Sequence, residues 1–136
     1  MTIDNLITVD YNRIQELIER SRYINFEIAL ENYNQIRKNS YTNIKKRIKD
    51  AILIYQDKFN DTLTKEEQII FALYLTIESD KLLENQLNNE LSIENIAKYY
   101  KVTTPFVKLR YQLLKYLKNK KLENKKLSLE NKKNED

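Results

Sequence analysis

Four polar residues near the C-terminal end recur at helical spacing and have side chains suited to contacting nucleic acid. They are Thr104, Lys108, Gln112 and Lys115. Residues three or four positions apart share one face of a helix, so these four would point the same way. Lysine can bind phosphate or guanine, and glutamine can pair with adenine. The residue types are suitable for DNA contact, although they are also typical of a solvated helix face.

The helix that would carry these residues is the second of two, joined by a tight turn within residues 91–117. Ser92 is a good N-cap for the first helix. Thr104 and Pro105 restart a helix, because the fixed φ and missing N–H of proline suit the first helical position. This is a helix-turn-helix pattern, although Lys101 stands where the turn usually carries glycine. The alternative interpretation is a plain helical corner inside a larger core.

The residue types that support most enzyme chemistry are missing. The 136 residues contain no histidine and no cysteine, which removes the usual zinc sites and the Ser-His and Cys-His nucleophiles. Glycine is also absent, so no phosphate-cradling loop is expected. The acidic residues show no cluster of defined spacing that would hold a metal ion. We therefore expect no catalytic residue, no metal and no cofactor.

Charge is unevenly distributed along the chain. Residues 1–90 carry 12 basic and 15 acidic residues (−3), residues 91–114 carry four against one (+3), and residues 115–136 carry eight against four (+4). A basic C-terminal third permits a nucleic-acid partner without requiring one. No apolar run approaches the roughly 20 residues of a membrane span, and the N-terminus has no signal-peptide pattern. We expect a cytoplasmic protein without membrane contact.

The periodicity predicts a mainly α fold, with a single helical domain over residues 1–117 and a lysine-rich flexible tail over 118–136. Helices are expected over 11–22, from Ser40 or Thr42 to 59, after a capping box at Thr64 and Glu67, and over 80–89. Residues 23–39 fit either a helix, which we favour, or a small β element. The residues expected in the packed interior are Phe71, Ala72, Leu75, Ile96, Ala97, Val102 and Val107.

From Thr64 onward the sequence resembles the C-terminal half of the ImmA/IrrE family of zinc metallopeptidases. Residues 67–78 (EQIIFALYLTIE) are similar to that family's E-A-x-x-F-A-x-x-L-L-M-P helix. Residues 96–111 (IAKYYKVTTPFVKLRY) are similar to its I-A-x-x-F-x-V-S-x-x-x-V-x-x-R-L segment. The HExxH motif is missing, and AILIYQDKF stands in its place. The third metal ligand of the family would fall on Glu67.

The resemblance implies a related fold that has lost the peptidase reaction. It suggests a non-catalytic regulatory protein of phage or mobile-element type that binds a protein partner, such as a repressor or a defence component. The groove for the family's substrate would lie near Tyr55, Asp57, Phe59 and Glu67, which makes these residues candidates for protein binding. A second resemblance, to the terminal helix-turn-helix domain of sigma factors and LuxR-type regulators, implies a DNA-binding transcription regulator instead.

Overall fold

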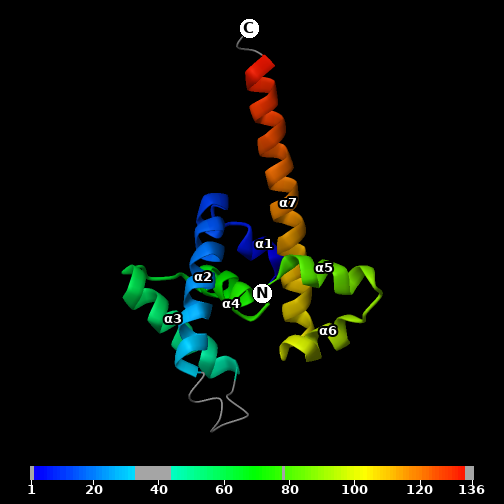
Figure 1. The fold of residues 1–136 in the computed structure, drawn as a ribbon. Helices are drawn as coiled ribbons and strands as arrows, with labels where there is room; N and C mark the ends of the chain where they lie inside the picture. Colours follow the sequence, from blue (N-terminus) through cyan, green and yellow to red (C-terminus); the bar gives the residue numbers. More distant parts are fainter. Residues whose placement is uncertain (1, 33–43, 78, 134–136) are drawn as a thin grey trace.

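Seven helices make up the part of the chain that the structure, a computed structural model, describes: residues 2–32, 44–77 and 79–133. No strand occurs in those ranges, so the prediction of a mainly helical single domain is confirmed. The helices are α1 (Ile3–Leu6), α2 (Tyr11–Asn32), α3 (Ile44–Phe59), α4 (Lys65–Thr76), α5 (Asp80–Asn88), α6 (Ile93–Tyr100) and α7 (Thr104–Lys133) (Figure 1).

The ambiguous stretch after residue 22 continues α2 as helix through Asn32. In a strand Ile24 and Phe26 would lie on the same face. In the structure Ile24 is buried and Phe26 is largely exposed, as the helix requires. The part of the β prediction that falls on residues 33–39 lies outside the described residues, as do the predicted helix starts at Ser40 and Thr42. The structure describes α3 from Ile44 onward.

Side-chain caps lie at the start of α2, where the Asp10 carboxylate accepts a bond from the Asn12 N–H at 3.1 Å, and of α4, α5 and α6. The Thr64 hydroxyl accepts a bond from the Glu67 backbone N–H at 3.3 Å, and the Glu67 carboxylate accepts one from the Thr64 N–H at 3.0 Å. This is the predicted capping box. Ser79 caps α5 and Ser92 caps α6, each at 3.1 Å, by accepting a bond from a backbone N–H of the first turn.

Two clusters of buried side chains form the core. The larger joins α1, α2, α3, α4 and α7, and the smaller joins α5, α6 and the start of α7 to Ile77. Phe106 packs against both clusters and so connects them. Of the seven residues predicted for the interior, five are buried, whereas Leu75 and Val102 are partly buried at the edges of the clusters.

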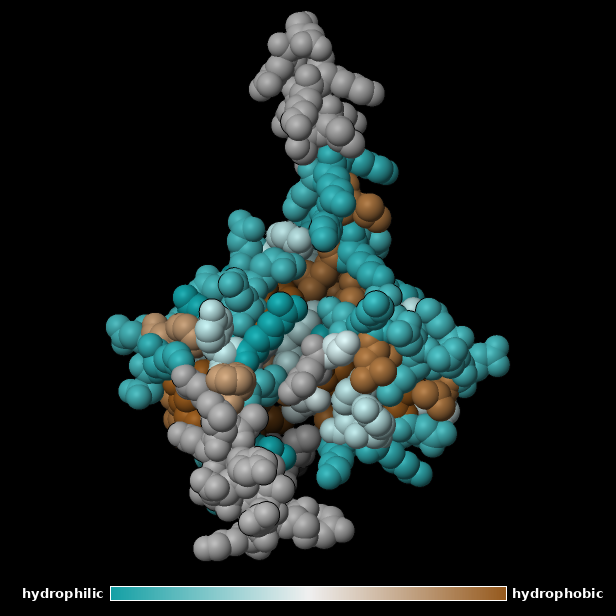
Figure 2. Space-filling model, in the orientation of Figure 1, coloured by the Kyte–Doolittle hydropathy of each residue, from teal (hydrophilic) through white to brown (hydrophobic). Residues whose placement is uncertain are grey.

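The helix α7 projects from the body of the molecule (Figure 1). Leu117 is its last buried residue among those whose side chains are described, and the surface beyond it is mostly hydrophilic (Figure 2). At residue 117, where we expected the helical domain to end, the side chains change from partly buried to mostly exposed. This boundary is not the end of a helix, because no glycine or proline follows and lysine, leucine and glutamate favour helix. Within the described ranges, no helix combines the length and apolarity needed to cross a membrane.

Candidate functional site

The turn between α6 and α7 closes with lysine in the position where glycine was expected. Lys101 has φ 59° and ψ 42°, the left-handed conformation. Its N–H bonds to the Lys98 carbonyl at 3.2 Å, and the Val102 N–H bonds to the Ala97 carbonyl at 2.9 Å. These two bonds make a Schellman motif, which ends α6 and redirects the chain into α7. The missing glycine therefore does not prevent the predicted turn.

This geometry predicts that Lys101→Gly stabilises the protein by about 0.5–1 kcal/mol, because glycine lacks the Cβ that makes the left-handed conformation unfavourable. Chemical denaturation measures the change in the free energy of unfolding. Lys101→Ala is the matched control: it also removes the long side chain but keeps the Cβ, so it should give no such gain. Equal effects of the two substitutions would contradict the argument.

The inner face of the corner is apolar and closed. Ile96 and Ala97 of α6 and Val107 of α7 pack with Leu83 of α5 and with Ile77. The small Ala97 side chain lets α6 and α7 approach closely. Because these side chains are directed inward, the opposite face of the first half of α7 is left to solvent.

That outer face carries the four candidate nucleic-acid contacts. Lys108, Gln112 and Lys115 are exposed, and Thr104 is half-buried at the first turn of α7. The Lys115 ammonium lies over the Tyr111 ring, 4.5 Å from its centroid, which steadies the side chain along the helix. The structure therefore brings the predicted set together on one accessible surface, as the spacing requires.

A buried arginine fastens α7 to the rest of the molecule. Arg110 is 0% exposed, and its guanidinium lies 3.4 Å from the centroid of the Tyr74 ring. One of its terminal nitrogens donates to the Leu73 carbonyl at 2.9 Å. Its Nε donates to the Asp80 carboxylate at 3.1 Å, and a second terminal nitrogen also bonds this carboxylate. The contact face of α7 is thus held in a fixed orientation relative to α4 and α5.

Sequence reasoning did not predict the role of Arg110. The available signal was its position on the apolar stripe of Val107, Leu114 and Leu117, where a charged residue must find a buried partner. Burial of Tyr74 raises the pKa of its phenol, and its hydroxyl is buried without a hydrogen-bond partner in the part of the chain described. Tyr74 therefore contacts the Arg110 guanidinium through its ring and not through its hydroxyl.

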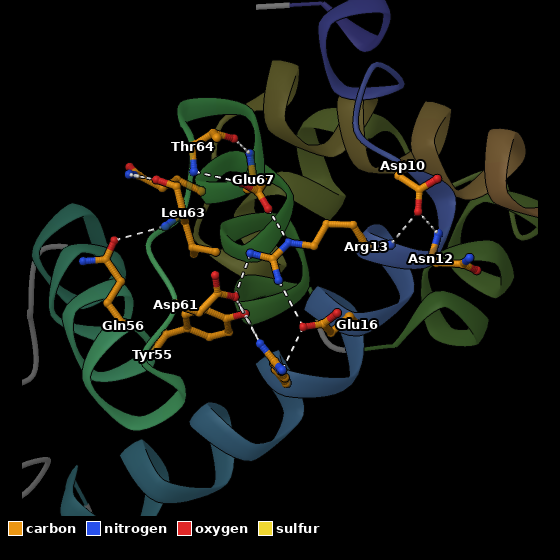
Figure 3. Close-up of polar contacts among 12 residues, drawn as sticks. Asp10, Asn12, Arg13, Glu16, Tyr55, Gln56, Asp61, Leu63, Thr64 and Glu67 are labelled. Carbon is orange, nitrogen blue, oxygen red and sulfur yellow. Dashed lines mark hydrogen bonds and ion pairs between the residues drawn. The ribbon is translucent and has the colours of Figure 1, made fainter.

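A second polar cluster joins α2, α3 and α4 (Figure 3). Arg13 bonds the Asp61 carboxylate at 2.7 Å, and it also contacts Glu67. Arg20 bonds Asp61 at 3.1 Å and the Tyr55 hydroxyl at 2.9 Å, and that hydroxyl donates to Asp61 at 2.8 Å. We call these five residues, Arg13, Arg20, Tyr55, Asp61 and Glu67, the interhelix charge cluster.

The cluster keeps its carboxylates ionised. Burial opposes the charged form of Glu67, but the Thr64 hydrogen bonds and the Arg13 guanidinium together lower its pKa below the ordinary value. Burial likewise opposes ionisation of Asp61, and bonds from Tyr55 and Arg13 together with the nearby arginine charges lower its pKa. Burial raises the pKa of the Tyr55 phenol, which therefore remains a hydrogen-bond donor.

The candidate protein-binding residues separate into two groups. Tyr55 (0% exposed) and Glu67 (8%) lie inside, where the interhelix charge cluster uses their polar atoms. Asp57 is exposed, and Phe59 is half-buried beneath the Arg20 guanidinium, 4.6 Å from its ring centroid. The four residues therefore do not form one accessible surface in this structure. Contact with a protein partner stays a prediction for Asp57 and Phe59.

The one residue that would correspond to a metal ligand of the ImmA/IrrE family, Glu67, has other partners. One oxygen of Glu67 accepts from the Thr64 N–H, and the other contacts Arg13. Among the described residues, no group of three or more acidic side chains is placed to hold a metal ion.

Comparisons with protein-family models, with curated proteins and with solved structures find no match. Both family resemblances therefore stay predictions, and the geometry of the chain itself carries the functional argument.

Proposed function

We propose that the chain is a non-catalytic regulatory protein that binds duplex DNA through the corner of α6 and α7. The observation that carries this proposal is the exposed face of Lys108, Gln112 and Lys115 on a helix whose opposite face is anchored. In helix-turn-helix proteins the second helix enters the major groove while the first crosses the backbone. Here α7 is the second helix, and it begins directly after the Schellman turn.

The distribution of charge along the chain also supports DNA contact at the corner of α6 and α7. Residues 91–114 have a balance of +3 and residues 115–136 of +4, whereas residues 1–90 have a balance of −3. Of the four basic residues in 91–114, Lys98, Lys101 and Lys108 are exposed, on α6, at the turn and on α7, whereas Arg110 is buried and pairs with Asp80. A duplex approaching this corner would meet the exposed lysines of α6, of the turn and of the first half of α7, and its phosphates would release counterions on binding. Gln112 is our candidate for direct contact with a base.

We expect Lys108→Ala and Lys115→Ala each to weaken DNA binding and to reduce the slope of log affinity against log salt by about one. Fluorescence anisotropy with a labelled random duplex at about 50 mM salt measures both effects. Lys49→Ala and Lys65→Ala remove exposed lysines of α3 and α4, outside the corner, and are the matched controls. If the controls lose as much affinity as the test variants, binding is not localised to the corner.

Binding of a protein partner is the second candidate function. The observation that favours it is the outward face of α3, where Leu53 is 59% exposed one turn before the exposed Asp57. In such an interface Leu53 would supply the apolar contact and Asp57 would lie at the polar rim. If no DNA binds and a pull-down enriches a protein with wild type but not with Leu53→Glu, this candidate replaces DNA binding.

A further inference from the structure

A groove of about 440 Å³ lies between the first half of α2, the start of α5 and the middle of α7. Its deepest lining residues are apolar: Leu114 and Leu117 are buried, and Ile18 is half-buried. The four basic residues that line it, Arg22, Lys81, Lys118 and Lys121, are exposed and therefore lie at its rim. Figure 2 shows hydrophobic surface at the base of the projecting α7.

The charges around this groove do not balance. Four basic and two acidic residues line it, an excess of two positive charges. Both acidic residues already have partners, since Asp80 bonds the buried Arg110 and Glu84 pairs with Lys118. In the described ranges, no carboxylate lies within ion-pair distance of Arg22, Lys81 or Lys121. These three cations are therefore available to an external anion.

We propose that this groove binds a small organic anion with an apolar body, such as an aryl or alkyl carboxylate or sulfonate. Its volume lies in the range of about 300–1,000 Å³ that is usual for small-molecule sites. The apolar side chains of the lining would cover one side of the ligand's body, and the three cations would select a negative group at the rim. The proposal does not depend on DNA binding, because none of the candidate DNA contacts lines the groove.

Titration with anilinonaphthalene sulfonate, an anionic dye that fluoresces on entering an apolar site, tests the proposal. We expect saturable binding of one dye per chain, weakened at least tenfold by Arg22→Glu/Lys121→Glu. The control Lys49→Glu/Lys65→Glu makes the same change in net charge at exposed positions outside the groove and should stay within twofold of wild type. Phenylnaphthylamine, which has the same aromatic body without the sulfonate, should bind more weakly and respond equally to both double variants.

The substituted side chains are exposed, so the variants should remain folded, and circular dichroism with a thermal midpoint checks this. Equal dye affinity in the groove variant and the control variant would overturn the proposal. So would the absence of saturable binding to the wild-type protein. Either outcome leaves the DNA measurement unaffected, because that measurement uses different residues and contains no dye.

Discussion

Arg110→Ala should lower the free energy of unfolding by about 2–5 kcal/mol, the range found when a large, fully buried side chain is truncated to alanine. The substitution deletes the largest fully buried side chain and with it the contacts to Asp80, the Leu73 carbonyl and the Tyr74 ring. Chemical denaturation followed by far-ultraviolet circular dichroism measures the loss. The helix should lose its attachment to α4 and α5, so DNA affinity should also fall.

Two further substitutions separate the role of charge from that of shape. Arg110→Lys keeps the charge but cannot reach the carboxylate and the carbonyl together, so it should recover only a small part of the loss. Lys108→Ala removes an exposed cation two residues earlier on the same helix and should change stability by less than about 0.5 kcal/mol. A loss below about 1 kcal/mol for Arg110→Ala would mean that the leucines of α7 hold the helix without the arginine.

Most of the fold could be predicted because its signals are local. The capping box at Thr64 and Glu67 and the caps at Ser79 and Ser92 each involve residues at most three positions apart. Helical periodicity likewise predicted the burial of Ile96 and Ala97 in α6 and of Val107 in α7. The fall in burial after Leu117 also follows from a local signal, because apolar residues become sparse beyond it.

Only one part of the candidate site, the exposed face of α7, could be predicted from the sequence. Lys108, Gln112 and Lys115 follow from helical spacing, so their common exposure could be expected. Tyr55 and Glu67 were assigned to a binding surface from the family resemblance, and nothing local shows that Arg13 and Arg20 lie against them. The contact between Arg13 and Glu67 spans 54 positions in the sequence, and that between Arg20 and Tyr55 spans 35. Such pairs depend on how α2 packs against α3 and α4, which periodicity does not specify.

The interhelix charge cluster gives the second large expected effect. Arg13→Ala should cost about 2–4 kcal/mol of stability, between the values for surface and fully buried ion pairs, because Arg13 is 23% exposed. It would leave Asp61 and the nearly buried Glu67 without their shared guanidinium. Arg22→Ala, which removes an exposed arginine from the same helix, is the control and should have little effect.

The pH dependence of the stability lost in Arg13→Ala shows whether Arg13 acts through its charge or through packing. The folded-state pKa values of Asp61 and Glu67 lie below their ordinary values of 3.8 and 4.5. Their contribution to stability is therefore full above the ordinary values and is lost as the pH falls through them toward the lower folded-state values. In Arg13→Ala the two carboxylates stay largely buried but lose this guanidinium, so both pKa values should be higher than in wild type. Acid should therefore destabilise the variant less than it destabilises wild type. The difference in unfolding free energy between the two proteins should thus shrink between about pH 6 and pH 3. A difference that stays constant over this range would show that Arg13 acts through packing alone.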